Sequence, residues 1–101
     1  SLAENCVYTH LSKDDIRVFY WKNKYEVDFV IEDSGGVVTP IEVKYQSEIN
    51  PEDFKGLYSF FKRFEKVKYG MMVTRDKFET VKTKDGRVVQ VVPLWLFLLS
   101  F

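Results

Sequence analysis

Apolar and polar residues alternate along much of the first half of the chain, a period-two pattern that predicts β-strands. A first strand is expected over residues 15–21, which are rich in β-branched and aromatic side chains. Two more strands are expected over residues 25–31 and 37–45. Between them the segment 32–36, with its Ser34-Gly35-Gly36 turn, has the composition of a hairpin connection.

Helical spacing appears on both sides of these strands. Ala3, Val7 and Leu11 recur at four-residue intervals and predict a short helix over residues 3–12. After the third strand, Asn50 can cap a second helix and Pro51 suits its first position. The apolar stripe of that helix consists of Phe54, Leu57, Tyr58, Phe61 and Phe64.

The rest of the chain predicts a central strand and a hairpin. Residues 69–74 are apolar enough to form a central strand, and residues 79–83 and 87–92 flank the turn Lys84-Asp85-Gly86. Pro93 opens a short, very apolar terminal helix. The order of elements predicts an α/β fold: an αβββαβ core with a mixed sheet flanked by helices, followed by a C-terminal hairpin and a short apolar helix.

Charged residues occupy one face of the second and third strands. Residues two apart in a strand share a face, so Glu42 and Lys44 point the same way. A three-residue Ser34-Gly35-Gly36 loop would set the antiparallel register so that Asp28 lies opposite Glu42. We expect the apolar faces of both strands to pack on the 54–64 helix and the charged faces to share the other side of the sheet.

These charged residues point to metal-dependent phosphodiester chemistry. Two carboxylates directly across from each other repel unless a proton or cation lies between them, and Mg²⁺ or Mn²⁺ bound by Asp28 and Glu42 would remove the conflict. Such an ion lowers the pKa of bound water and polarises a phosphoryl oxygen. Lys44 would orient the attacking water and offset developing charge, and Gln46 would extend the row and hold a water or phosphate.

Other interpretations of the polar residues stay open. Asp28, Glu42 and Lys44 also fit a simple ladder of cross-strand salt bridges on an exposed face. Glu26 is either an acid that supports Asp28 or a solvent-exposed residue at the strand start. The lone His10 favours a structural or surface role over metal binding, since the chain has no matching pair of Cys or His residues.

Charge is unevenly distributed although the formal net charge is zero. Residues 1–50 hold nine acids and five bases, for −4, and residues 51–101 hold six acids and ten bases, for +4. A basic face in the second half would suit DNA, with an ordinary solvated surface as the alternative. The bases concerned are Lys62, Arg63, Lys66, Lys68, Arg75, Lys77, Lys82, Lys84 and Arg87. The candidates for base stacking, which also fit core positions, are Tyr8, Tyr45, Tyr58 and Tyr69.

The ends of the chain and its cysteine content set its expected location. The single Cys6 excludes an internal disulfide framework, and no signal peptide is present, so we expect a cytoplasmic protein. Residues 94–101 are apolar but far short of the roughly 20 residues that span a bilayer. They are expected to pack on the sheet or to form a homodimer surface. Because no initiator Met precedes Ser1, we expect residues 1–101 to be a single domain excised from the C-terminus of a longer protein.

The whole arrangement resembles the PD-(D/E)xK nuclease superfamily over roughly residues 3–74. In that superfamily a helix with an acid precedes three strands, of which the second carries Asp and the third Glu-x-Lys. The corresponding residues here are Glu4, Asp28, Glu42 and Lys44, with Gln46 where related enzymes often keep a polar residue. The resemblance implies a restriction-endonuclease-like fold, DNA as substrate, and a metal held by Glu4, Asp28 and Glu42. Val27 stands where the superfamily's name has proline.

A closer resemblance is to the nuclease-like C-terminal domain that follows a P-loop ATPase module in many archaeal and bacterial AAA-type proteins. It rests on residues 3–7, 19–21, 26–31, 40–44, 55–57 and 93–96. It implies a DNA nuclease attached to an ATPase domain in the same polypeptide, with ATP bound only outside this chain, which lacks the GxxxxGK[ST] motif. The alternative is a catalytically inactive nuclease-fold module that binds DNA or regulates the ATPase.

Overall fold

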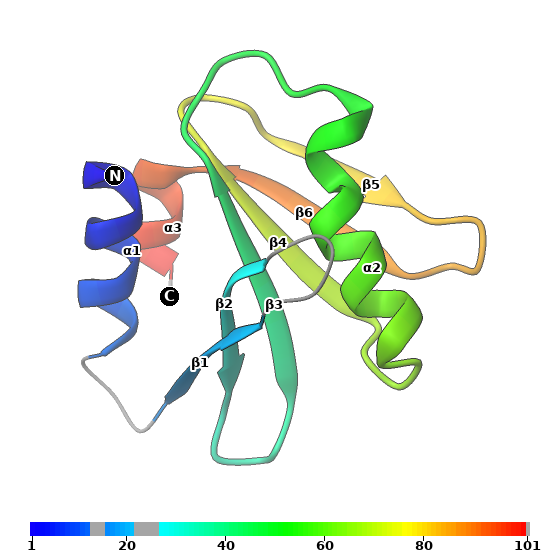
Figure 1. Cartoon of the computed structure of the whole chain (residues 1–101). Coiled ribbons are helices and arrows are strands. Elements are labelled where there is room, and N and C mark those ends of the chain that lie inside the picture. Colours follow the sequence, from blue (N-terminus) through cyan, green and yellow to red (C-terminus); the bar gives the residue numbers. More distant parts are fainter. Residues whose placement is uncertain (13–15, 22–26, 101) are drawn as a thin grey trace.

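A six-stranded mixed sheet forms the centre of the part of the chain that the structure, a computed structural model, describes: residues 1–12, 16–21 and 27–100 (Figure 1). Its strands follow the order β1-β2-β3-β4-β6-β5. Their bounds are Arg17–Trp21 (β1), Val27–Glu32 (β2), Val38–Lys44 (β3), Tyr69–Thr74 (β4), Glu79–Lys82 (β5) and Val88–Pro93 (β6). The helices are Leu2–Leu11 (α1), Lys55–Arg63 (α2) and Leu94–Ser100 (α3), with a 3₁₀ turn, η1, at Pro51–Phe54.

This element order confirms the α/β fold that the sequence predicts. The helix expected after Asn50 begins with the 3₁₀ turn η1, where the side chains of Asn50 and Asp53 each accept a hydrogen bond from the other residue's backbone. The strand starts expected at residues 15 and 25, and Glu26, lie outside the described residues. β3, β4 and β6 run parallel, and α2 provides the crossover between β3 and β4.

The register of the β2–β3 hairpin is the predicted one. Phe29 pairs with Ile41 and Glu32 with Val38, so the positions of each pair sum to 70. The N–H of Asp33 donates to the carbonyl of Val37 at 3.0 Å and closes the loop. Gly36 lies at φ +82°, a left-handed conformation that glycine adopts without steric cost.

The expected pairing of sheet faces with helices was wrong. Phe29 and Ile41 pack with α1 and α3, whereas the stripe of α2 covers Met72 and Val89 on the opposite face. Figure 1 shows α2 on one side of the sheet and the two terminal helices on the other. Period two shows which residues share a face but not which helix covers it, and Glu42, which pairs with Met72, therefore lies on the α2 face.

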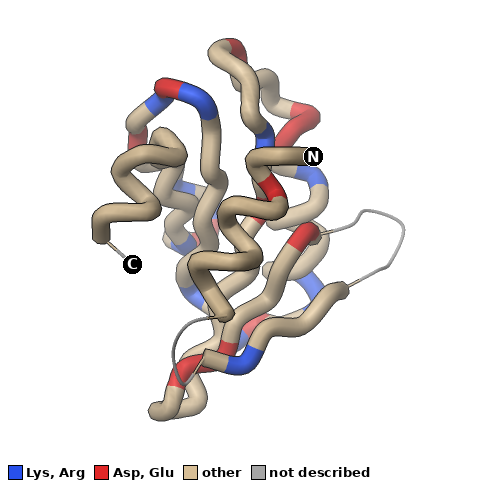
Figure 2. Tube along the Cα trace, turned by 90° about the vertical axis from the view of Figure 1, so that its left-hand side faces the viewer, with Lys and Arg blue, Asp and Glu red and all other residues tan. Residues whose placement is uncertain are grey.

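The terminal helices form one layer. The ring centroids of His10 in α1 and Phe97 in α3 lie 5.7 Å apart, and Phe97 is only 1% exposed, which confirms that the apolar end of the chain packs in the core. α3 has no charged residue, so its tube is tan throughout in Figure 2. Neither α3 nor any other helix in the described residues has the length and apolar character to cross a bilayer.

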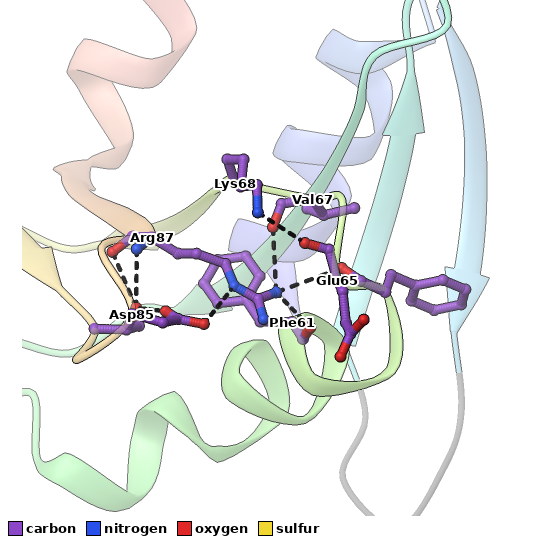
Figure 3. Close-up of polar contacts among 8 residues, drawn as sticks. Phe61, Glu65, Val67, Lys68, Asp85 and Arg87 are labelled. Carbon is purple, nitrogen blue, oxygen red and sulfur yellow. Dashed lines mark hydrogen bonds and ion pairs between the residues drawn. The ribbon is translucent and has the colours of Figure 1, made fainter.

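Arg87, in the β5–β6 hairpin, connects this hairpin to the end of α2 through side-chain hydrogen bonds (Figure 3). Its Nη1 donates to the carbonyl of Phe61 in the last turn of α2 and to those of Phe64 (3.4 Å) and Val67 (3.2 Å) in the segment that follows. Helix geometry leaves a last-turn carbonyl such as that of Phe61 without a partner inside the helix. The Nε of Arg87 donates to Asp85 at 3.0 Å, and the guanidinium carbon lies 5.2 Å from the centroid of the Phe61 ring. Arg87 is therefore a buried structural residue and does not belong to a solvent-facing basic surface.

Removing the Arg87 side chain is expected to destabilise the fold. Arg87→Ala removes the side-chain donor of the Phe61 and Val67 carbonyls, whereas the Phe64 carbonyl still accepts from the Val67 N–H at 3.1 Å, so the free energy of unfolding should fall by about 3 kcal/mol. Urea denaturation followed by circular dichroism measures the loss. The exposed Arg75, which hydrogen-bonds Ser47, provides the control Arg75→Ala. A loss no larger than that of the control would show that Arg87 does not hold α2 in place.

Candidate functional site

The candidate site lies where β2 and β3 separate. The register, extended beyond Phe29 and Ile41, places Asp28 opposite Glu42. Here carboxylates replace part of the backbone ladder: the Val43 N–H donates to Asp28 Oδ2 at 2.7 Å, and the Asp28 N–H donates to Glu42 Oε1 at 3.1 Å. Each acid thus binds the backbone of the other acid's strand, which fixes both side chains in orientation.

The two carboxyl groups are held in an electrostatically unfavourable position. Burial raises the pKa of Asp28, although the hydrogen bond from Val43 opposes this. Burial and then the neighbouring Asp28 carboxylate raise the pKa of Glu42 to about 8. The Glu42 side chain is 9% exposed, so little water reaches it to stabilise its charge. Near neutral pH the pair therefore retains a proton that a cation could replace.

Lys44 is the basic member of the group. Its Nζ lies 3.6 Å from Glu42 Oε2, and its side chain is 35% exposed. The positive charge lowers the pKa of both acids, but burial outweighs it. Lys44 thus contacts the acid pair at the carboxyl end of β3 while part of the side chain still faces solvent.

Glu4 approaches from α1. Its carboxylate belongs to a capping box with Ser1, and its charge raises the pKa of Asp28, which places the two acids close together. Glu4 and Asp28 line one cavity of about 680 Å³. The structure thus brings acids from the first helix, second strand and third strand to one region, as the sequence predicts.

Gln46 lies beyond the end of β3 and is held by the next loop. Its Nε2 donates to the carbonyl of Glu48 at 2.9 Å and to Asp53 Oδ2 at 3.2 Å. These two hydrogen bonds connect the end of β3 to the start of η1 rather than to the acid pair. A role for Gln46 in holding a water or phosphate stays a prediction.

Sequence reasoning missed two aromatic residues of the site. Tyr20 and Trp21 at the end of β1 line the cavity of Glu4 and Asp28, as does the candidate Tyr8. Both were assigned only to a strand, because period two does not distinguish an edge strand from a central one. The available signal was the lack of polar residues from 18 to 21, which puts aromatic side chains on both faces of the strand.

The donor set suits a hard divalent ion. Asp28 Oδ1 and Glu42 Oε2 take no part in the backbone hydrogen bonds, and carboxylate oxygens are the ligands that Mg²⁺ and Mn²⁺ favour. In the described residues no three Asp, Glu, His or Cys side chains form a ready metal cluster. The fit therefore rests on the Asp28–Glu42 pair, and Glu4 as a third ligand stays a prediction.

The acid pair predicts an unusual pH dependence of stability. The folded protein keeps the Glu42 proton up to about pH 8, whereas the unfolded chain releases it near the ordinary value of 4.5. The folded state binds more protons between these values, so its free energy of unfolding falls as pH rises, by at most about 1.4 kcal/mol per pH unit. Urea titrations in EDTA should show this slope.

Substitution of Glu42 checks the origin of the slope. Glu42→Gln keeps an oxygen that accepts the Asp28 N–H but does not ionise, so its stability should change less between pH 5 and pH 9. Glu79→Gln, at an exposed residue of β5, is the matched control and should keep the slope. An unchanged slope in Glu42→Gln would contradict the raised pKa.

Comparison with known proteins identifies the family. No curated protein and no solved structure matches the chain. A family model described as a domain of unknown function, DUF4143, matches residues 1–97. This domain is found in proteins associated with AAA ATPases. The match spans nearly the whole sequence, including α1 and the acid pair, and the chain therefore belongs to the DUF4143 family.

Proposed function

We propose that this domain hydrolyses DNA phosphodiester bonds with the help of a divalent metal ion held by Asp28 and Glu42. The observation that carries the proposal is the reciprocal bonding of the two acids, each to the other's strand, with Lys44 Nζ 3.6 Å from Glu42. A salt-bridge ladder explains the position of Lys44, but it does not explain two adjacent carboxyl groups that keep a proton near neutral pH.

Each residue has a role that follows from its position. Asp28 and Glu42 would hold the metal, with Glu4, which lines the same cavity as Asp28, as the candidate third ligand. A bound ion would supply polarisation of the phosphoryl oxygen and acidification of water. Lys44, partly exposed beside Glu42, would orient the attacking water and stabilise negative charge as it develops on the phosphate. The backbone bonds of the acids would keep these groups in place without reorganisation during the reaction.

The setting of the domain is part of the proposal. The occurrence of DUF4143 domains in ATPase-associated proteins supports an ATPase module in the same polypeptide. ATP would act there, because this chain has no phosphate-binding motif of the P-loop type. The nuclease domain would then act on DNA that the ATPase module moves or remodels.

A catalytically inactive DNA-binding or regulatory module is the second candidate. One observation favours it: the Gln46 amide is held by Glu48 and Asp53 rather than by the acid pair. This candidate keeps the fold and DNA affinity but predicts no metal-dependent cleavage. The same experiment therefore distinguishes the two.

Cleavage of supercoiled plasmid tests the proposal. With Mg²⁺ or Mn²⁺ the protein should nick plasmid, and Asp28→Asn and Lys44→Ala should each slow nicking about 100-fold or more, since each removes a group that stabilises the transition state. Glu79→Gln, at an exposed residue of β5, is the matched control and should cut like the unmodified protein. EDTA should stop the reaction.

Two results would contradict the nuclease proposal. Nicking that persists in Asp28→Asn and Lys44→Ala would come from a contaminant or another site. No nicking by the unmodified protein, with calorimetry finding no Mg²⁺ or Mn²⁺ binding and DNA affinity intact, would establish the inactive module instead.

A further inference from the structure

A second groove lies on the α2 side of β1 and adjoins the acid cavity. It has a volume of about 730 Å³ and is lined by side chains of β1 and by the end of α2. Tyr20 and Trp21 line both this groove and the cavity of Glu4 and Asp28. The end of the edge strand β1 therefore borders both hollows.

The floor of the groove is aromatic. The Trp21 ring packs edge-on against Phe60, with centroids 5.2 Å apart, and against Phe64 at 6.2 Å. Phe19 remains 41% exposed, and Tyr20, which is 72% exposed, has its ring 5.9 Å from that of Phe29 on the α1 side of the strand, beside the acid cavity. Such flat, solvent-accessible rings at an edge strand are costly to leave in water unless something covers them.

The rim of the groove is basic. Lys62, Arg63 and Lys66 line it, all of them exposed, and Glu65 is the acid among its lining residues. The Arg63 guanidinium lies 5.0 Å from the centroid of the Phe64 ring, so cation and aromatic face are already combined. These charges stand at the C-terminal end of α2, where cations are also favoured by the helix dipole.

We infer that this groove binds single-stranded nucleic acid and leads it to the acid pair. Aromatic side chains stack on unpaired bases while lysine and arginine neutralise the phosphates, which is how strands are held without sequence preference. A duplex hides its base faces in the stack, so it would gain nothing from the aromatic floor. The direction of the strand toward Asp28 rests on the proposed function, whereas binding in the groove does not.

Binding in EDTA separates this inference from cleavage. Fluorescence anisotropy with a labelled twenty-nucleotide oligothymidine should give a Kd at least tenfold lower than with the same length of duplex. Tyr20→Ala should weaken oligonucleotide binding about tenfold, and Tyr20→Phe, which keeps the ring, should bind normally. Lys66→Glu should weaken binding and flatten its dependence on salt.

Matched controls come from outside the groove. Phe78→Ala removes an aromatic ring that is 63% exposed, and Glu79→Gln removes an exposed charge in β5; both should bind like the unmodified protein. In a Trp95→Phe background, Trp21 is the remaining tryptophan of the chain. Its fluorescence should be quenched when the oligonucleotide binds, because the indole then contacts bases.

The possible outcomes are distinct. Duplex binding as tight as single-strand binding, Tyr20→Ala no weaker than Phe78→Ala, or no quenching of Trp21 would overturn the groove assignment, even if plasmid is nicked. Tight, Tyr20-dependent binding of the oligonucleotide supports it, even if the protein cuts nothing and the nuclease proposal fails.

Discussion

The exchange of hydrogen bonds between Asp28 and Glu42 is the interaction on which the candidate site depends. The β2–β3 ladder runs in register from the Gly36 turn to Phe29 and Ile41. Beyond this pair, the backbone N–H groups of Asp28 and Val43 donate to the two carboxylates instead of to backbone carbonyls. An acid that merely faced solvent would be mobile and ionised. Here the backbone holds both acids together, and burial raises the pKa of Glu42 to about 8. The raised pKa of Glu42 lowers the free energy of unfolding at neutral pH, and the same arrangement keeps the two carboxylates in position as ligands.

The layer arrangement determines what surrounds this pair. α2 and the terminal helices cover opposite faces of the sheet, and Asp28 follows Val27, which pairs with Trp21 at the end of the edge strand β1. Glu4 comes from α1, and the aromatic rings of Tyr20 and Trp21 come from β1. Arg87 holds the far end of α2, which carries the basic rim of the groove. The fold therefore places the acid pair, the basic side chains at the end of α2 and the exposed rings of β1 around the end of one edge strand.

Much of this could be predicted from the sequence. The loop Ser34-Gly35-Gly36 gave the hairpin register, and the alternation of apolar residues gave the element order. Which helix covers each face could not be predicted. Alternation of apolar residues shows which side chains share a face, but it does not show on which side of the sheet the helix between two strands packs. The roles of Arg87 and Tyr20 could not be predicted either. Arg87 depends on carbonyls 20 to 26 residues away in the chain, and Tyr20 depends on β1 being an edge strand.

The central claim is that Asp28 and Glu42 form a site for a divalent cation. Anomalous diffraction from crystals soaked in Mn²⁺ near pH 8 tests it most directly, because manganese is identified by its own scattering. The account predicts an anomalous peak between Asp28 and Glu42, at about 2.2 Å from an oxygen of each, and no such peak in Glu42→Gln crystals. A well-ordered acid pair in hydrogen-bond contact, with no peak at millimolar Mn²⁺, would contradict it.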